Sequence, residues 1–371
     1  MRPVWAEVDL NAIAHNLREV RRIIPKTTKI MAIVKANAYG HGAFQVAQRA
    51  LETGADYLGV ALLAEAVQLR EHGIASPIMI LGYTSEEDYP EVIKHAITQT
   101  VFTYRQAQRL SEAAQTLNQT AKIHIKVDTG MGRIGFQSTE QAIQEITAIA
   151  KLPGIEIEGL FTHMAKSDAK DKTYSQMQLE KFLWVCREVE KAGVKVALKH
   201  AANSGAIIDL PEAHLDIVRP GIMLYGLYPS DEVDKSKLQL QPAMSLKAKI
   251  VHLKEVEAGT SISYGCTFTT KKRSRIATLP LGYADGYTRL LSNKGVALVR
   301  GCRVPVVGRV CMDQCMLDVS DVESVAVGDE VVLLGRQGEA VISVDEVAES
   351  IGTINYEVVC MVSYRVPRKY I

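Results

Sequence analysis

The chain has 371 residues, with 43 basic and 42 acidic side chains, so its net charge is close to zero. That length exceeds one ordinary hydrophobic core and predicts two domains, one of which can be a large barrel. The balanced charge offers no basic stripe to a phosphate backbone, which excludes nucleic acid as an expected partner.

A membrane-spanning segment and a metal site are not expected either. The N-terminus lacks the apolar core of a signal peptide, and no run approaches the roughly 20 apolar residues of a membrane helix, so a cytoplasmic protein without membrane contact is predicted. The six cysteines are scattered, and Cys311 and Cys315 alone lie close together. Such spacing is a poor zinc signal, so we expect reduced thiols and no metal site.

From residue 30 to about residue 220, short β-branched runs alternate with amphipathic segments. Helical patterns fill the gaps, for example over 62–72, 104–117 and 174–192. Eight β-then-α units predict a (β/α)8 TIM-type barrel, whose active site lies at the C-terminal ends of the strands. The eight predicted strands cover residues 30–35, 57–61, 77–81, 98–102, 122–128, 155–163, 196–200 and 215–219.

Beyond Pro242 the pattern changes to alternating segments separated by turn signals, which predicts a mainly-β domain. The polar stretch before it shows no periodicity and is typical of a linker. The α/β chain is therefore expected to divide into a strand that pairs with the C-terminal domain, the barrel, a linker and the β domain. These four segments cover residues 1–10, 11–230, 231–241 and 242–371.

Lys35 ends the apolar run 30–34, where a turn with small residues and glycines opens toward a helix. Taken alone, a strand-end lysine usually extends to water. A lysine whose stem is held by a core strand and whose amine lies in a pocket can instead be desolvated into a nucleophile that forms Schiff bases. Pyridoxal 5'-phosphate is the aldehyde that such a lysine indicates.

Other polar residues also follow predicted strands. Since strand ends of a barrel meet at one face, we expect these side chains to lie together, although strand ends are also where polar residues ordinarily resume. They are Lys126 with Arg133, His163, Asn203 with Ser204, and Arg219.

Residues 130–135 fit the pattern G-x-G-x-x-G after a strand, which invites a dinucleotide-binding interpretation. That fingerprint needs its first glycine directly after the strand and an acidic residue at the end of the next strand. Here Asp128 and Thr129 intervene, and the next strand ends in His163. We reject the interpretation.

Six motifs, spread over nearly the whole chain, resemble the alanine racemase family of fold-type III pyridoxal phosphate enzymes. The resemblance implies a homodimer with active sites shared between subunits, which interconverts L- and D-alanine and supplies D-alanine for peptidoglycan. The motifs are AIVKANAYGHG (32–42), KVDTGMGRIG (126–135), RPGIMLYG (219–226), SISYGCTF (261–268), GYADGY (282–287) and RVCMDQ (309–314).

The resemblance also implies roles for individual residues. Lys35 and Tyr264 would be the two catalytic bases, with Tyr264 reaching the barrel of the other subunit. Arg133 and the Met312 amide would bind the substrate carboxylate. The remaining roles are: cofactor contacts by Tyr39, His163, Asn203, Ser204, Arg219, Gly221, Ile222 and Tyr356; a carbamate on Lys126 that orients Arg133; and support from Asp313 and Tyr283.

The type of residue at 219 has a chemical logic. A guanidinium can only donate hydrogen bonds, so opposite a pyridine nitrogen it leaves that nitrogen unprotonated. A neutral ring is a weaker electron sink, which favours rapid return of the proton to Cα over transamination.

Three alternatives stay open at this level. A racemase for serine or a broader set of amino acids would share every motif, because a small pocket rejects one added hydroxyl only weakly. A fold-type III decarboxylase is more distant. A non-catalytic pyridoxal phosphate carrier would keep Lys35 but need neither Tyr264 nor the β domain.

Overall fold

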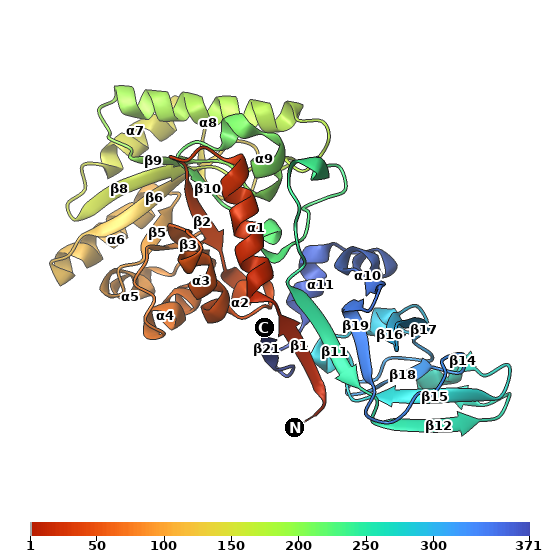
Figure 1. Cartoon of the computed structure of the whole chain (residues 1–371). Helices are drawn as coiled ribbons and strands as arrows, with labels where there is room; N and C mark the ends of the chain where they lie inside the picture. The colour runs from red at the N-terminus through yellow and green to blue at the C-terminus, as the bar shows by residue number, and fades with distance from the viewer. Residues whose placement is uncertain (1) are drawn as a thin grey trace. The chain divides into compact units, whose positions relative to one another are not determined.

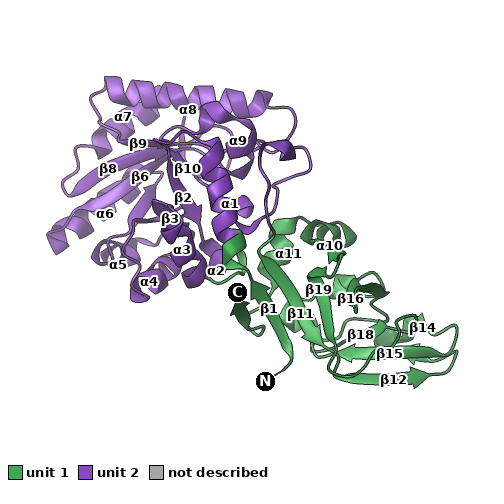
Figure 2. Ribbon diagram, viewed as in Figure 1, with its two compact units in different colours: residues 1–12, 39–42, 242–371 green, residues 13–38, 43–241 purple. Residues whose placement is uncertain are grey.

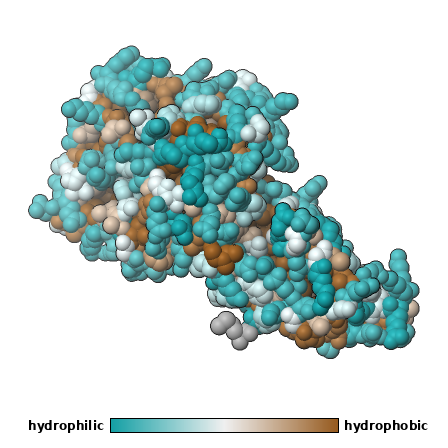
Figure 3. Space-filling view, viewed as in Figure 1, coloured by the Kyte–Doolittle hydropathy of each residue, from teal (hydrophilic) through white to brown (hydrophobic). Residues whose placement is uncertain are grey.

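The computed structural model describes residues 2–371, which form two compact units (Figure 2). Unit 2 contains residues 13–38 and 43–241, and unit 1 contains residues 2–12, 39–42 and 242–371. Within the described chain, no helix is both long and apolar enough to cross a membrane. The face seen in Figure 3 is mostly hydrophilic, with hydrophobic residues in scattered patches.

Unit 2 is a nearly closed barrel of eight parallel strands in the order β10-β2-β3-β4-β5-β6-β8-β9 (Figure 1). Backbone hydrogen bonds of 3.0 Å from Asp216 to Lys199 and from Arg219 to Ala202 join its two edge strands. The predicted TIM-type barrel is thereby confirmed. The strands are β2 (Lys29–Ile33), β3 (Tyr57–Val60), β4 (Ile78–Ile80), β5 (Thr98–Val101), β6 (Ala121–Asp128), β8 (Ile155–Phe161), β9 (Leu198–His200) and β10 (Ile217–Val218).

Helices surround this sheet in Figure 1, and their ends follow ordinary capping chemistry. The hydroxyl of Thr103 accepts a hydrogen bond from the Gln106 amide, which starts α6, and Asn118 in the left-handed region ends it. The helices are α1 (Leu10–Ile23), α3 (Ala43–Glu52), α4 (Leu63–Glu71), α5 (Tyr89–Lys94), α6 (Tyr104–Leu117), α7 (Glu140–Ile149), α8 (Thr173–Lys191) and α9 (Ser204–Asp209).

Unit 1 is mainly β, as predicted, and its largest sheet has the order β17-β16-β19-β11-β1-β21, with β20 paired to β19. Strands β12, β15 and β18 form a second sheet, and β13 pairs with β14. The strands are β1 (Val4–Val8), β11 (Met244–Lys249), β12 (His252–Val256), β13 (Ser261–Ile262), β14 (Phe268–Thr269), β15 (Ser274–Leu279), β16 (Val296–Val299), β17 (Cys302–Pro305), β18 (Cys315–Asp318), β19 (Glu330–Gln337), β20 (Ala340–Ile342) and β21 (Arg368–Tyr370).

Alternating side chains of these strands build the core of unit 1. Ile276 and Val307 pack with Ile262, while Leu298 and Val332 form part of a second cluster. Two helices that the sequence pattern did not indicate, α10 (Val344–Ile351) and α11 (Asn355–Met361), complete the unit.

The N-terminal strand β1 belongs to this sheet. It pairs antiparallel with β11, where Val4 lies opposite Ala248, and parallel with β21, where Ala6 lies opposite Arg368. The sequence-based domain limits themselves stay predictions.

A tight return of the chain after β6 positions the loop that carries Arg133. The two-residue strand β7 (Phe136–Gln137) pairs with the end of β6, and an Asp128 oxygen accepts hydrogen bonds from the amides of Gly130 (3.0 Å) and Gly132 (3.1 Å). Gly135 makes the return possible, because its φ is +140° and a Cβ there would lie 2.4 Å from the Asp128 nitrogen.

Gly135→Ala should therefore destabilise unit 2 by about 2–4 kcal/mol, since it adds a backbone clash to an unfavourable φ. Gly193→Ala is the matched control, because Gly193 also has a positive φ (+89°) but no atom within 4 Å of its Cβ position. It should cost only about 1 kcal/mol. Free energies of unfolding from urea titrations measure both, and equal losses would contradict the role of the clash.

Candidate active site

Lys35 begins a left-handed turn. Strand β2 ends at Ile33, and α2 (Lys35–Tyr39) follows, in which Ala36, Asn37 and Ala38 all have φ of 52° and Tyr39 has φ of 50°. Each such non-glycine residue costs about 1–2 kcal/mol relative to the right-handed region. Strain of this kind gathers at functional sites, where the surrounding structure holds it in place.

Two polar side chains hold this turn. The Glu65 carboxylate accepts hydrogen bonds from the amides of Ala36 (2.6 Å) and Ala61 (2.8 Å), which ties the turn to the end of β3. The Asn37 side chain accepts from the Ala43 amide at 2.8 Å, where α3 starts. The sequence pattern placed Lys35 at a strand end but indicated neither the left-handed turn nor Glu65.

Arg219 follows β10 and is buried, with 3% of its surface exposed. Its Nη1 donates to His200 Nδ1 at 2.8 Å, and its Nη2 donates to the carbonyls of Thr162 (2.8 Å) and Ala201 (3.0 Å). Burial lowers the pKa of Arg219 to about 9, so the guanidinium remains charged at neutral pH. Among residues 2–371, no acceptor receives its Nε–H.

Lys126 projects from β6 and is equally buried. Its amine lies 4.5 Å from the centre of the Phe161 ring and has no hydrogen-bond partner in the described chain. Burial, then the charges of Arg219 and Arg133, hold the pKa of Lys126 well below its ordinary value. The lowered pKa makes this amine easier to deprotonate, and once deprotonated it can react as a nucleophile.

The pKa of His163 shows that several basic side chains from the strand ends lie close to its ring. Its pKa is held well below the ordinary value, first by burial and then by the charges of Arg219, Lys126, Arg133 and Lys35. Four basic side chains from the ends of three strands (β2, β6 and β10) thus act on one imidazole, which stays neutral. This cation cluster, as we call these four residues, favours an anionic ligand.

Ser204 and the residues after Arg219 form a second polar region. Ser204 Oγ accepts from the Gly221 amide at 3.0 Å, so that amide is engaged, while the hydroxyl proton can still be donated. Ile222 begins the short 3₁₀-helix η3 (Ile222–Tyr225), whose first amides lack intrahelical acceptors. The region can therefore present hydrogen-bond donors to a phosphate.

Asn203 has a structural role. Its Oδ1 accepts from the Ala206 amide (3.2 Å), which caps α9, and from the Ser167 hydroxyl (2.6 Å), while its Nδ2 donates to the Met164 carbonyl (3.2 Å). The side chain is thus occupied by the protein. Its predicted contact with a cofactor stays a prediction.

Unit 1 carries the other predicted residues. The rings of Tyr39 and Tyr356 lie 6.2 Å apart between centroids, inclined by 46°. Burial, and to a smaller extent Cys360, raises the pKa of Tyr39, so its hydroxyl stays protonated and can donate.

Tyr264 lies at the tip of the β13–β14 hairpin, in the one-turn helix η5 (Tyr264–Cys266), and 72% of its surface is exposed. The preceding Ser263 has φ of 67°, and its hydroxyl donates to the Arg309 carbonyl at 2.6 Å. The loop that presents Tyr264 is therefore attached to the segment that leads to Met312.

The segments with Tyr283 and Met312 are joined in turn. The Tyr283 amide donates to the Cys311 carbonyl (3.0 Å), and the Ala284 amide donates to the Met312 carbonyl (3.1 Å). Both Met312 and Tyr283 expose about half of their surface (52% and 42%). The structure thus brings Tyr264, Tyr283 and Met312 together on three connected loops.

A buried carboxylate supports these loops. Asp285 accepts hydrogen bonds from both terminal nitrogens of Arg2 (3.0 and 2.5 Å), and Arg365 lies 3.4 Å away. Arg365 also binds Asp313 at 2.5 Å. Asp313 was predicted from its motif, whereas Arg2, Asp285 and Arg365 were not, because no local pattern links residues this far apart in the sequence.

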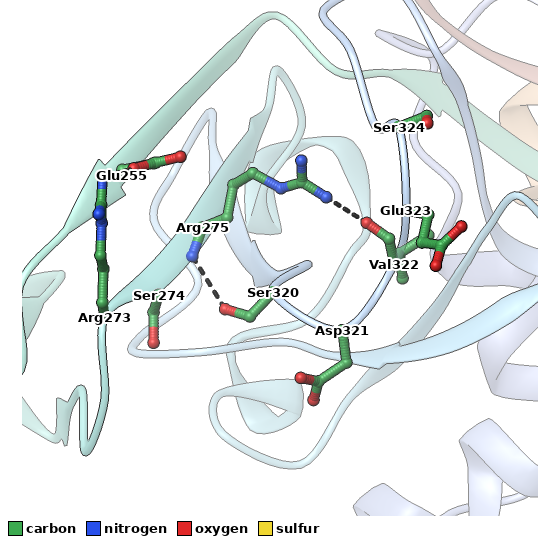
Figure 4. Close-up of a pocket in the computed structure, with 9 residues that line it drawn as sticks. All are labelled: Glu255, Arg273, Ser274, Arg275, Ser320, Asp321, Val322, Glu323 and Ser324. Carbon is green, nitrogen blue, oxygen red and sulfur yellow. Dashed lines mark hydrogen bonds and ion pairs between the residues drawn. The ribbon is translucent and has the colours of Figure 1, made fainter.

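An open hollow of about 700 Å³ on unit 1 is not this site (Figure 4). It lies beside β15, where the Arg275 amide donates to the Ser320 hydroxyl (2.8 Å) and its guanidinium points to the Val322 carbonyl. None of the predicted site residues lines it. In the described chain, no group of three or more His, Cys, Asp or Glu side chains could hold a metal ion.

Comparisons with known proteins agree along the whole chain. The alanine racemase N-terminal domain model matches residues 8–229, and the C-terminal domain model matches residues 243–370. Alanine racemase of Desulforamulus reducens is 54% identical over 369 residues, which cover 100% of this chain and 99% of the relative.

Solved structures give the same result. Alanine racemase of Clostridium difficile 630 has a TM-score of 0.97 and 45% identity, covering 100% of this chain and 96% of that one. That of Bacillus anthracis with bound L-Ala-P has a TM-score of 0.94 and 41% identity, covering 100% and 95%.

A parallel barrel with a cation cluster at its strand ends, joined to a mainly-β unit that presents an exposed tyrosine, defines together with these matches an isomerase that racemises amino acids. More particularly, the chain belongs to the alanine racemase family.

Glu65→Gln tests how the Lys35 turn is held. A carboxylate offers both amides an acceptor oxygen, whereas glutamine turns a donor toward one of them, so we expect a loss of about 1–3 kcal/mol in unfolding free energy. Glu71→Gln on the same helix is the control, because Glu71 is exposed. Equal stabilities of the two variants in urea titrations would show that Glu65 does not hold the turn.

Proposed function

We propose that the protein interconverts L-alanine and D-alanine with pyridoxal 5'-phosphate, using Lys35 and Tyr264 as bases on opposite faces of the substrate. The observation that carries the proposal is the place of Lys35, which starts a strained turn at a barrel strand end and contributes to the cation cluster. A structural lysine would need neither the strain nor three neighbouring cations.

The residues present fit this cofactor. Lys35 provides an amine for its aldehyde, and Arg219 keeps an unused Nε–H for the pyridine nitrogen. Ser204, Tyr39 and Tyr356 would hold the phosphate by their hydroxyls and Ile222 by its amide, while the Gly221 amide would keep Ser204 in place. The neutral His163 would pack beside Arg219. When bound, pyridoxal phosphate supplies the electron sink that makes the substrate Cα–H acidic.

Arg219 keeps that electron sink weak. Its buried guanidinium is fixed through Nη1 and Nη2 and stays charged at neutral pH, so it would donate to the ring nitrogen of a bound cofactor and would leave that nitrogen unprotonated. Return of the proton to Cα would then be favoured over transamination.

Arg133 is proposed to bind the substrate carboxylate and the cofactor hydroxyl. It is exposed on its loop and therefore needs an anion to orient it. Lys126 can provide one: after losing its ammonium proton, which its lowered pKa favours, its unpartnered amine would add to carbon dioxide and lose a second proton, giving a carbamate that accepts from Arg133.

The second base requires a second subunit in this proposal. Tyr264 exposes 72% of its surface, and Met312 and Tyr283, on the loops joined to it, are also large side chains exposed on unit 1. A monomer rarely leaves such residues together in water. We propose that a second copy covers them, so that its Tyr264 and the Met312 amide complete the barrel site, while Tyr283 and Tyr356 line the entrance.

In this arrangement the barrel, residues 11–230, would hold the cofactor, and residues 231–241 would link it to the β domain. The β domain, residues 242–371 together with the strand within residues 1–10, would carry the second base. Asp313, through Arg365 and Asp285, supports the Met312 loop. D-alanine would serve peptidoglycan synthesis, and the cytoplasmic location stays a prediction.

The first experiment measures D-amino acid formation from a panel of L-amino acids with purified protein and pyridoxal phosphate. We expect L-alanine to be converted at least about tenfold faster than L-serine, because a small pocket discriminates one added group by about 1–3 kcal/mol. Lys35→Ala should abolish conversion. Comparable rates for alanine and serine would replace the proposal with a broader racemase.

Tyr264→Phe should slow racemisation in both directions by the same factor, as detailed balance demands. Because Lys35 removes the proton from D-alanine and Tyr264 removes it from L-alanine, exchange of the Cα proton with deuterium should persist from D-alanine and nearly vanish from L-alanine. Tyr83→Phe, which also removes an exposed phenol, is the control. Loss of exchange from both enantiomers would rule out the assignment of faces.

Mixing inactive Lys35→Ala and Tyr264→Phe proteins tests the shared site. A hybrid dimer would contain one site with both bases and one with neither, so activity should return up to about half of the wild-type value per hybrid. Subunit exchange is verified independently with two affinity tags. Verified exchange without activity would place both bases in one chain.

A further inference from the structure

Four side chains of unit 2 form one hydrogen-bonded chain that ends at Arg219. Arg219 Nη1 lies 2.8 Å from His200 Nδ1, His200 Nε2 lies 2.7 Å from His124 Nδ1, and His124 Nε2 lies 3.0 Å from a Glu158 oxygen. None of the inner three has more than 3% of its surface exposed. Its members come from four strands of the barrel. Arg219 directly follows β10, and His200, His124 and Glu158 lie in β9, β6 and β8.

The direction of every bond in this chain follows once Arg219 is known to donate. A guanidinium cannot accept, so His200 Nδ1 must be the acceptor and the proton of neutral His200 must lie on Nε2. That proton is donated to His124 Nδ1, which places the proton of His124 on its own Nε2. The last acceptor is then the Glu158 carboxylate.

The surroundings keep both rings neutral and the carboxylate charged. Burial, then Arg219, holds the pKa of His200 well below its ordinary value, and burial outweighs Glu158 in lowering the pKa of His124. The hydrogen bond from His124 lowers the pKa of Glu158, and Lys122 also lies 3.5 Å from this carboxylate. Each neutral ring therefore carries one proton, on one of its two nitrogens.

Two features of the β6–β8 pair make room for the His124 ring. The pairing of β6 with β8 shifts register between Ile123 and His124, and Gly159 lies opposite. A Cβ at Gly159 would approach the His124 ring to 2.7 Å, so only glycine leaves room for it. His200 is in turn stacked on Phe161, with ring centroids 4.8 Å apart.

We propose that His124 and Glu158 are positioning residues for the racemase reaction, which fix the tautomer of His200 and thereby hold the Arg219 guanidinium as a donor aimed at the pyridine nitrogen. The inference rests on the proposed function for its consequence in catalysis. The tautomers follow from the geometry of the protein alone, so they can be tested without cofactor or activity.

The direct test is ¹⁵N–¹H NMR of the cofactor-free protein labelled in histidine, with His124→Gln and His200→Gln used for assignment. At pH 7.5 both rings should be neutral with the proton on Nε2. A proton on Nδ1 of His200, or a charged ring, would overturn the proposal. This measurement needs no folded variant beyond those used for assignment.

Paired variants test the consequence. His124→Gln keeps an acceptor for His200 and a donor for Glu158, whereas His124→Leu keeps neither and leaves the buried Nε2–H of His200 unsatisfied. With pyridoxal phosphate, His124→Leu should lower kcat about tenfold at nearly unchanged KM for alanine, and His124→Gln should stay within about threefold of wild type.

His214→Leu is the matched control, because His214 is equally buried and bonds a carbonyl (Ile207) outside the chain. It should lose stability without the loss in kcat. Equal kcat for His124→Leu and His124→Gln would reject the positioning role. Absent alanine racemisation by the wild-type protein would instead reject the proposed function and leave the tautomers to stand.

Discussion

The burial of one guanidinium sets the conditions for the rest of the barrel mouth. Arg219 cannot leave water without acceptors, and it finds them in two carbonyls and a histidine nitrogen. Because these acceptors are neutral, the positive charge is not cancelled. Burial is the larger cause that lowers the pKa of Lys126, His163 and His200, and the Arg219 charge adds to it at all three side chains.

The second constraint is backbone strain. Four successive non-glycine residues after Lys35 are left-handed, and the local sequence cannot stabilise this turn by itself. Glu65 and Asn37 offset the strain through bonds to amides of the turn, of β3 and of α3. The turn that carries Lys35 is thus held by hydrogen bonds to the segments after β3 and at the start of α3, which suits a residue that must bind a cofactor and move a proton in a defined direction.

The barrel strands were predictable because β-branched runs bounded by turns carry a local signal, and Lys35 and Arg219 followed from their positions at strand ends. The left-handed turn after Lys35 was not predictable, because alanines such as Ala36 and Ala38 give no sequence signal for a positive φ. The hydrogen bond between His124 and His200 involves a histidine placed at a register shift between β6 and β8. The ion pair of Arg2 and Asp285 joins residues that are 283 positions apart in the sequence. Such features depend on the completed fold.

The position of β1 has a consequence for biogenesis. Val4–Val8 lies between strands formed by residues 244–249 and 368–370, so the large sheet of unit 1 joins strands that precede and follow the barrel in the sequence. On the ribosome, the barrel segments are complete while β1 still lacks both neighbours. Strand β1 must therefore wait, with unpaired edges, for β11 and β21. Unit 1 is then the later of the two units to fold, and the edges of β1 are exposed to aggregation until it does.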